Sequence, residues 1–272
     1  MELRDEGTKI KKCSNNKRRK EQHIDAPITR ERINYTMTHD NNCNNTNHHD
    51  VYMTRHSARA DREISGWTPL FGRKRDDTEI SSGGKVASDE LAARLENVSI
   101  AHIVSSPFYR CLQTVAPIAI AKDIPIKVEP GICEVLSTFP PGFWETEQLA
   151  QEFPMIDQEY QPILKRQDLS QEHGDSQAAK RSQKVATTLR KHLDGPILFC
   201  GHGASCLGIA SAFGASGYVG YSSFSHFRPG TTNANKSGGT DKVQSTQWQV
   251  LAFGDVSHLS ADLRQQSMDS AW

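Results

Sequence analysis

The sequence lacks a net charge and lacks long hydrophobic runs. Lys and Arg together number 32, and Asp and Glu together also number 32. The charge of the whole chain therefore favours neither nucleic acid nor an acidic partner, and any anion site must be formed locally. The chain has no run of about 18 consecutive apolar residues and no apolar segment near its N-terminus, which excludes the usual patterns of a membrane span and a secretion signal. We expect a soluble, cytoplasmic protein with no membrane partner.

The spacings that mark metal sites are also absent. Six cysteines are scattered along the chain, with no Cys-x-x-Cys pair, and the histidines form no His-Glu-x-x-His motif. Several of the cysteines lie inside apolar segments. We expect reduced, mostly buried thiols in an intracellular protein, with no metal ion and no cofactor.

Hydrophobic residues are sparse near the start of the chain. They make up 36% of the 272 residues, and the mean hydropathy is −0.60, which is low for a chain packed from end to end. Residues 1–49 contain Asn-rich runs and show no helical or strand periodicity. We predict a disordered tail over residues 1–49 and a folded domain over residues 50–272.

The tail carries a basic cluster with no acidic residue between Lys9 and Lys20. Such a cluster has the composition of a nuclear address or of a nucleic-acid patch, although basic runs in tails are more often plain solvated segments. We expect no nucleic-acid partner and leave a nuclear location open beside the cytoplasmic one.

From residue 50 onward, short apolar runs alternate with helical patterns. This alternation is typical of a parallel sheet with crossover helices, and it predicts a three-layer α/β sandwich with a mostly parallel central sheet. The expected strands span residues 50–55, 101–105, 125–129, 195–200 and 248–253. The expected helices span residues 84–96, 107–121, 146–153, 176–193 and 204–213. We expect a mobile loop over residues 230–245 and a frayed end after the last strand.

The stretch Val51–Arg59 concentrates chemically active residues where a strand should end. Its apolar start gives way to Arg55, His56 and Arg59. A guanidinium matches the geometry of phosphate oxygens, and a neutral imidazole can attack phosphorus. These residue types together favour phosphoryl transfer through a phosphohistidine. On these residues alone, the alternative is a basic surface turn with a solvated histidine.

Polar residues follow two further predicted strands. Ser105–Arg110 comes after the second strand, and Gly201–Gly203 comes after the late buried strand. Ligands of open α/β sheets bind at the carboxyl ends of the strands, so we expect these segments to share one crevice with His56. A helix N-terminus after Ser105 should also face that crevice, with Arg110 one turn along the helix.

In these segments the chain resembles the histidine phosphatase (phosphoglycerate mutase-like) superfamily. The matching residues are Thr54–Arg59 for the Arg-His-Gly motif, Ser105–Thr114 for the helix with the second arginine, and Gly201–Gly203 for the second histidine. Within the superfamily, the chain looks most like the branch of ubiquitin-associated, SH3-containing phosphatases and ecdysteroid-phosphate phosphatases. That closer resemblance rests on Asp61 after the first motif, on Val128–Glu134, and on Phe153–Asp157 with Tyr160 and Pro162.

The resemblance implies a metal-independent hydrolase that cleaves a phosphomonoester, either protein phosphotyrosine or a small-molecule phosphate. It implies that His56 is the nucleophile and that Glu134 protonates the leaving oxygen. The remaining residues of the implied phosphate pocket are Arg55, Arg59, Arg110 and His202. A preorganised cage of this kind stabilises the charge that spreads over the equatorial oxygens in the transition state.

Ser57 stands where the superfamily has a glycine. Glycine lets the backbone approach the phosphate and adopt left-handed dihedrals, and a non-glycine residue in that region costs roughly 1 to 2 kcal/mol. The serine hydroxyl could instead donate to a phosphate oxygen. A second hypothesis is therefore a pseudo-phosphatase that binds phosphorylated ligands without turnover, and a lesser one is a phosphoglycerate mutase-type phosphotransferase. The sequence identifies neither the substrate nor the oligomeric state.

Overall fold

The computed structural model describes residues 49–69, 72–230 and 247–270. Of the tail predicted over residues 1–49, only residue 49 lies within the described ranges. Of the loop predicted over residues 230–245, only residue 230 does. Within the described ranges, no helix is both long and apolar enough to cross a membrane.

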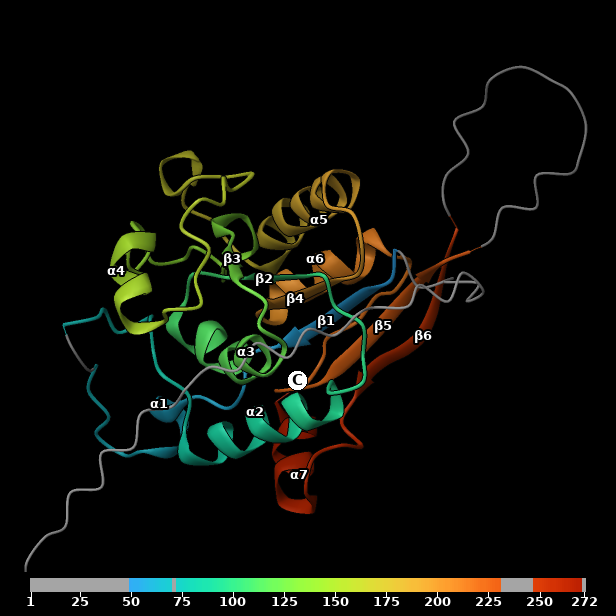
Figure 1. Ribbon diagram of the computed structural model, residues 1–272. Helices are drawn as coiled ribbons and strands as arrows, with labels where there is room; N and C mark the ends of the chain where they lie inside the picture. Colours follow the sequence, from blue (N-terminus) through green and yellow to red (C-terminus); the bar gives the residue numbers. More distant parts are fainter. Residues whose placement is uncertain (1–48, 70–71, 231–246, 271–272) are drawn as a thin grey trace, which may run out of the picture. The chain divides into compact units, whose positions relative to one another are not determined.

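A six-stranded sheet forms the centre of the domain, in the order β3-β2-β4-β1-β5-β6 (Figure 1). The strands are β1 (Val51–Arg55), β2 (His102–Ser105), β3 (Ile126–Val128), β4 (Ile197–Gly201), β5 (Phe224–Pro229) and β6 (Trp248–Asp255). β3, β2, β4 and β1 are parallel, whereas β5 and β6 join antiparallel at one side. The predicted α/β class with a mostly parallel sheet is confirmed.

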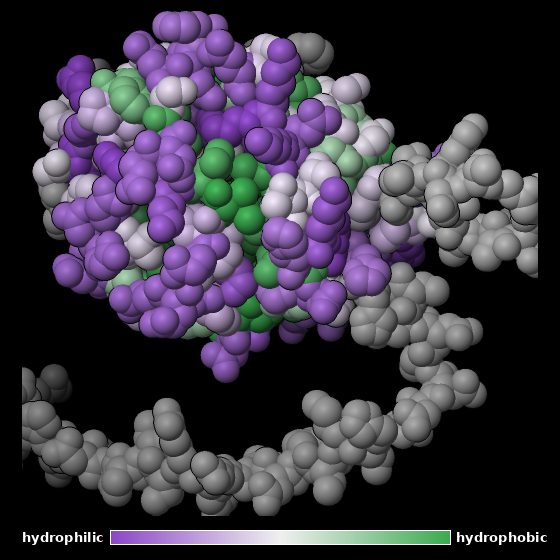
Figure 2. Space-filling model, turned by 90° about the horizontal axis from the view of Figure 1, so that it is seen from above, coloured by the Kyte–Doolittle hydropathy of each residue, from purple (hydrophilic) through white to green (hydrophobic). Residues whose placement is uncertain are grey.

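Helices cover both faces of the sheet. They are α1 (Ala60–Glu63), α2 (Ser82–Arg94), α3 (Tyr109–Lys122), α4 (Thr146–Glu152), α5 (Asp175–His192), α6 (Gly203–Ala212) and α7 (Ala261–Asp269), with short 3-10 helices at Pro130–Ile132 and Arg166–Asp168. Figure 1 shows α5 and α6 on one face and α2 and α3 on the other. Seen from above, the surface is mostly hydrophilic, with a hydrophobic area in the middle of the face (Figure 2).

Alternate residues of the parallel strands serve two separate hydrophobic cores. Tyr52 and Leu198 pack with residues of α2 and α3. Met53 and Phe199, their neighbours in the chain, pack with residues of α5 and α6. Successive side chains of a strand point to opposite faces, so a continuous apolar run fills both cores. For this reason, the apolar runs of β1 and β4 predict strands from the sequence alone.

The sequence pattern predicts neither β5 nor α7. β5 contains Ser225 and His226 and ends at Pro229, a composition that is typical of a loop. The frayed end expected after the last strand is wrong, because α7 forms there. Leu259, just before α7, is 2% exposed, and Gln266 Nε2 donates to Glu63 Oε1 at 2.6 Å. Contacts with distant segments therefore stabilise a helix that has no strong apolar face of its own.

The helix that carries Arg110 begins two residues later than its prediction. α3 begins at Tyr109, so Pro107 lies before the helix, and Pro117 lies inside it. A carboxylate outside the helix supplies the first hydrogen bond: Asp77 Oδ1 accepts from the Tyr109 N–H at 2.7 Å. The loop that contains Asp77 thus fixes where α3 starts.

Several residues of the branch-specific resemblance have structural roles. Glu129 is fully buried, and its carboxylate accepts hydrogen bonds from the backbone N–H groups of Ile163 and Leu164. It also accepts the Tyr160 hydroxyl proton at 2.9 Å. These bonds tie the segment around residues 160–164 to the end of β3, close to the turn that carries Glu134.

Close packing of α5 on α6 depends on Gly208. A Cβ at this position would lie 2.0 Å from the carbonyl oxygen of Ala179. We therefore expect Gly208→Ala to lower the free energy of unfolding by about 1 to 3 kcal/mol, although alanine is the better helix former. Urea denaturation measures this change. Gly203→Ala is the matched control in the same helix, because the nearest atom to its Cβ would lie 3.8 Å away. Equal losses in the two variants would contradict the packing argument.

Candidate active site

Neighbouring strands bring the predicted site segments together. β2, β4 and β1 lie side by side, and Ser106, His202 and His56 directly follow their carboxyl ends. The His56 N–H donates to the Gly201 carbonyl at 3.0 Å, and the Ser106 N–H donates to the Cys200 carbonyl at 3.0 Å. The three segments therefore share one crevice, as their positions after the strands predict.

His56 is buried in a defined tautomeric state. It is 1% exposed, and its Nδ1 lies 2.8 Å from the Ser57 carbonyl oxygen. A carbonyl oxygen only accepts hydrogen bonds, so Nδ1 carries the proton and Nε2 keeps its lone pair. Burial, and then the positive charges of Arg110 and Arg55, hold the pKa of His56 well below its ordinary value. At neutral pH, His56 is a neutral imidazole whose Nε2 is free to attack.

Arg110 and His202 form a buried pair beside His56. The ring centroids of His202 and His56 are 5.1 Å apart. Arg110 Nη2 donates to His202 Nδ1 at 3.1 Å, so neutral His202 carries its proton on Nε2, which donates to Ser106 Oγ at 2.8 Å. Burial, and then Arg110, lower the pKa of His202 well below its ordinary value. The positive charge of this pair therefore resides on Arg110.

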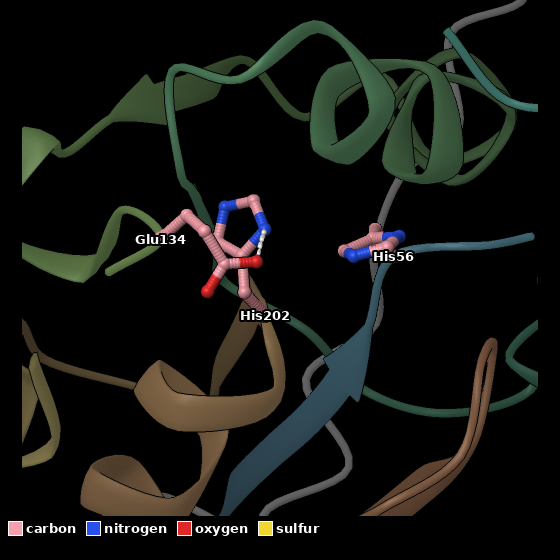
Figure 3. Close-up of side chains that lie close together, drawn as sticks. All are labelled: His56, Glu134 and His202. Carbon is pink, nitrogen blue, oxygen red and sulfur yellow. Dashed lines mark ion pairs between the residues drawn. The ribbon is translucent and has the colours of Figure 1, made fainter. Parts of the chain in front are cut away.

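Glu134 lies next to the two histidines (Figure 3). A carboxylate oxygen of Glu134 and one ring nitrogen each of His56 and His202 all lie within 4.8 Å of one another. Glu134 Oε2 is 3.4 Å from His202 Nδ1, the contact drawn dashed in Figure 3, and 3.4 Å from Arg110 Nη2. Because His202 is neutral, the ion pair is with Arg110. The Glu134 side chain is 29% exposed, so it can exchange protons with a leaving group or with water.

The predicted phosphate ligands Arg55 and Arg59 already have partners within the protein. Arg55 Nη1 donates to the carbonyls of Val219 at 3.0 Å and Ser270 at 2.7 Å. Arg59 donates through Nε and Nη2 to the Asp61 carboxylate at 2.9 and 2.8 Å. The Nε and Nη2 groups of Arg59 are therefore both bonded to Asp61. Arg55 still has N–H donors that the bonds of its Nη1 do not use. Their roles as phosphate ligands stay predictions.

A cavity of about 250 Å³ opens at Arg59, Arg110 and Glu134. It is lined by Arg59, Asp76, Phe108, Arg110, Glu134 and residues 135–138. Within the described part of the chain, Arg55 Nε and Arg110 Nε are buried without a hydrogen-bond partner. Leaving a buried N–H unpaired costs free energy. An oxyanion that reached either guanidinium would give that N–H group a partner.

A second cavity, of about 780 Å³, lies beside the first. Phe143 lines this larger cavity and Phe108 lines the smaller one. The two rings pack edge to face with centroids 5.4 Å apart, and the Phe108 ring also contacts His202 with centroids 5.1 Å apart. This aromatic pair therefore joins the linings of the two cavities.

Ser57 has neither the conformation nor the contacts expected from its place in the motif. Among the described non-glycine residues, only Asp123 and Ser222 have a positive φ, so Ser57 is not in the left-handed region. Its hydroxyl lies 2.6 Å from Ser222 Oγ and 2.8 Å from Ser88 Oγ, buried away from the cavity lining. The expectations of backbone strain and of a hydroxyl donated to phosphate are both wrong. The structural reason to suspect an inactive site is therefore removed.

Tyr221 and Ser106 are parts of the site that the sequence reading does not identify. The Tyr221 ring lies 5.3 Å from the His56 ring, and the Arg55 guanidinium lies 4.4 Å over it. Tyr221 precedes β5, which has no clear sequence signal, so nothing places it beside His56. Ser106 belongs to a quoted motif, but the pairing of its hydroxyl with His202 joins residues far apart in the sequence.

His56, Glu134 and His202 are also spaced so that they could hold a metal ion, the one such set among the described residues. Two neutral imidazoles and a carboxylate are suitable zinc ligands. The guanidinium groups of Arg55 and Arg110 beside them would repel a cation. The electrostatics of this set therefore suit an anion better.

The fold and the site together define a class of protein. It is an α/β protein with a buried, neutral histidine at the end of a central strand, surrounded by arginine donors suited to a phosphoryl group. The sequence model of the histidine phosphatase superfamily (branch 1) matches residues 51–245, which is more than half of the 272 residues. The chain therefore belongs to the histidine phosphatase superfamily, as its motifs predict.

Individual relatives agree with this assignment. The ecdysteroid-phosphate phosphatase of Drosophila melanogaster is 26% identical over an alignment of 188 residues, with coverage of 56% of this chain and 25% of that protein. The chain thus spans about a quarter of the length of this curated relative. The crystal structure of the ecdysone phosphate phosphatase from Bombix mori in complex with tungstate has a TM-score of 0.54 and 21% identity, covering 71% of this chain and 97% of that one.

A mycobacterial glucosyl-3-phosphoglycerate phosphatase in complex with inorganic phosphate has a TM-score of 0.51 and 17% identity. The comparison covers 78% of this chain and 100% of that one. At these identities, the solved structures show that the fold is shared.

Asp77, which caps α3, makes the stability of the domain depend on pH. It is 0% exposed, and burial raises its pKa from 3.8 to about 6, against the opposing effect of the Tyr109 N–H. The folded state therefore binds this proton more tightly than the unfolded state does. Stability from this group is fully present below about pH 4 and is lost as the pH rises through about 6.

We expect Asp77→Asn to remove this loss, because the amide oxygen can still accept from Tyr109. Between about pH 4 and pH 7, wild type should lose about 2 kcal/mol of unfolding free energy relative to the variant. Urea denaturation at several pH values measures the difference. Asp157→Asn is the control of opposite sign, since the hydrogen bond from Lys127 lowers the pKa of Asp157 and its contribution is lost on acidification. A pH-independent difference between wild type and Asp77→Asn would refute this account.

Proposed function

We propose that the protein is a metal-independent phosphatase that hydrolyses a phosphomonoester through a phosphohistidine on His56. The observation that carries the proposal is the hydrogen bond from His56 Nδ1 to the Ser57 carbonyl. It leaves Nε2 of a buried, neutral imidazole with a free lone pair, close to unpaired donors of Arg55 and Arg110. Membership of the histidine phosphatase superfamily supports phosphatase chemistry in general.

In the first half of the proposed reaction, His56 Nε2 attacks phosphorus. The N–P bond forms, the ester P–O bond breaks, and Glu134 in its acid form gives its proton to the leaving oxygen. The charge on the equatorial oxygens faces the arginine donors. The ring gains a positive charge, which the Nδ1–H bond to the Ser57 carbonyl stabilises.

In the second half, water attacks the phosphoryl group. Glu134, now a carboxylate, takes a proton from the water, the N–P bond breaks, and inorganic phosphate leaves. His56 returns to its neutral form with the proton still on Nδ1. No step in this cycle needs a metal ion, because the arginines neutralise the phosphoryl oxygens.

For the substrate, we propose protein phosphotyrosine or a small-molecule phosphate, such as those in the names of the relatives. The site cavity of about 250 Å³ is smaller than the usual ligand pocket of about 300 to 1,000 Å³. The leaving group would therefore extend past Ser137 and Thr138, which are exposed at its rim. An open rim favours hydrolysis over the mutase alternative, which has to shield the phosphoenzyme from water.

The first test compares wild type with His56→Ala for release of inorganic phosphate from an aryl phosphate in the presence of a chelator. We expect the variant to lose activity at least about a thousandfold, as for other removed nucleophiles. A rapid acid-free quench of wild type with labelled substrate should trap a base-stable, acid-labile phosphoenzyme. His173→Ala is the control, because His173 is an exposed histidine outside the site.

Other results would change the proposal in defined ways. Full activity of His56→Ala would exclude the phosphohistidine, and loss of wild-type activity with the chelator would exclude metal independence. If phosphate raises the thermal stability of wild type and no substrate is turned over, the protein is a binding module, since ligands that bind the native state stabilise it.

The second test addresses Glu134. Glu134→Gln keeps an acceptor for the Val135 N–H, which donates to Glu134 Oε1 at 3.0 Å, but it cannot donate the acid proton. We expect the first-turnover release of alcohol from an alkyl phosphate to fall about a hundredfold or more. Release of nitrophenol from nitrophenyl phosphate should fall much less, because nitrophenolate leaves without protonation. Equal losses for both substrates would remove Glu134 from the role of acid.

A further inference from the structure

Ser57, the residue after the proposed nucleophile, uses all of its polar groups to connect parts of the site. Its N–H donates to Thr114 Oγ1 on α3 at 2.9 Å. Its carbonyl accepts the Nδ1–H of His56 at 2.8 Å. Its hydroxyl lies between the hydroxyl groups of Ser222 and Ser88. All of these residues are at most 1% exposed, so water does not compete for the bonds.

The proton of each hydroxyl in this chain can be assigned. Ser88 Oγ lies 2.9 Å from the Gly84 carbonyl, which only accepts, so Ser88 donates its one proton there. Ser57 must then donate to Ser88 Oγ at 2.8 Å, and Ser222 must donate to Ser57 Oγ at 2.6 Å. The hydroxyl chain therefore runs in one direction, from the loop before β5 through Ser57 to α2.

This chain restrains the residue whose carbonyl faces the nucleophile. The Ser57 side chain is held by α2 on one side and by the loop of Ser222 on the other, while its N–H is held by α3. The direction of the carbonyl is then fixed from three sides of the residue. Thr114, which accepts the Ser57 N–H, also donates to the Arg110 carbonyl at 2.7 Å. The same contacts therefore align His56 with the helix turn that carries Arg110.

We propose that the Ser57 hydroxyl is a positioning group for His56: it holds the Ser57 carbonyl against Nδ1–H and so keeps Nε2 as the attacking nitrogen. A glycine, which has no hydroxyl, cannot make this connection. The inference rests on the proposed function for its catalytic consequence, but the tautomer of His56 is a property of the free protein.

The positioning effect is larger in the transition state than in the ground state. The imidazole ring is neutral before attack and gains positive charge as the N–P bond forms. A hydrogen bond from a charged donor is about twice as strong as one from a neutral donor. Loss of the restraint should therefore lower kcat and leave KM nearly unchanged, since phosphate contacts are made by other residues.

The experiment uses the full chain and compares Ser57→Ala with wild type. We expect kcat to fall about tenfold to a hundredfold, which is the effect of a small misplacement of a reacting group. In ¹⁵N NMR spectra of histidine-labelled protein without substrate, His56 should carry its proton on Nδ1 in wild type. A fraction of the Nε2–H tautomer should appear in Ser57→Ala.

Ser182→Ala is the matched control. Ser182 is also 0% exposed, and its hydroxyl donates to the Ala178 carbonyl at 2.8 Å within α5, without contact to His56. The variant removes the same kind of buried bond. We expect it to lose stability to a similar extent but to keep the kcat and the His56 tautomer of wild type.

Ser222→Gly tests the chain from its other end if Ser57→Ala does not fold. Ser222 has a φ of 53°, which glycine adopts readily, so the backbone is not strained by this change. We expect a lower kcat without a loss of thermal stability, because the donor to Ser57 is gone while the turn is relaxed.

Two results would overturn the proposal. One is an Nε2–H tautomer of His56 in wild type. The other is a kcat within about twofold of Ser182→Ala in both Ser57→Ala and Ser222→Gly. A third result separates the two proposals. If wild type releases no phosphate but the His56 tautomer differs between wild type and Ser57→Ala, the proposed function fails and the positioning role of Ser57 stands.

Discussion

The guanidinium of Arg110 is 1% exposed at the centre of the site, and a buried charge is costly unless its N–H groups are bonded. Its partners come from separate segments: the Asp76 carbonyl at 2.9 Å, His202 Nδ1 at 3.1 Å and Glu134 Oε2 at 3.4 Å. The loop after α1, the start of α6 and the turn after β3 must therefore all be in place before this charge is accommodated. Since these segments also supply the other groups of the site, the bonds to Arg110 and the geometry of the site form together.

The same charge determines which protonation states surround the proposed phosphoryl position. Burial and Arg110 are the two largest effects that lower the pKa of both His56 and His202, so neither ring adds a positive charge. The protein thus gathers guanidinium charges and neutral imidazoles in one buried region. The like charges of Arg55 and Arg110 repel each other, and the negative charge of a phosphoryl group would offset this repulsion. The electrostatics that keep His56 neutral therefore also favour an anionic group beside it.

The part of the site that sequence predicts is the part that directly follows strands of the parallel sheet. His56 and His202 come right after apolar runs, and parallel strands end at one edge, so their proximity follows from the order of the strands. Ser222 and Tyr221 reach His56 through β5, an antiparallel strand with a weak pattern, and Ser270 reaches Arg55 through α7, which tertiary contacts stabilise. The positions of these three residues depend on the tertiary contacts of β5 and α7, and the spacing of residues in the sequence does not predict those contacts.

The wrong expectation for Ser57 has a different origin. It assumed that a glycine in a motif marks a left-handed backbone, yet the structure has ordinary dihedrals there. The space that a Cβ needs is supplied by small neighbours, Ser88 and Ser222, which lie far away in the sequence. A single position in a motif therefore does not show whether its substitution is tolerated. The residues that pack around it decide this, and here they convert the added side chain into hydrogen bonds.

Different parts of the cavity lining depend on different parts of the structure. Arg59 and Phe108, which cap α1 and α3, line one part of the cavity, whereas another part depends on two loops that bind each other. Asp76 Oδ2 accepts the Gly142 N–H at 2.9 Å, and Lys74 Nζ donates to the Pro140 carbonyl at 3.2 Å. A Cβ on Gly142 would lie 1.9 Å from Asp76 Oδ1, so the loops meet at close contact.

Loops of this kind can change in length and sequence without disturbing the sheet. In the proposed reaction, recognition of the phosphoryl group would consequently depend on the shared fold, and selection of the leaving group would depend on the contact between these two loops. This division would explain why the superfamily motifs predict phosphatase chemistry and leave the substrate open.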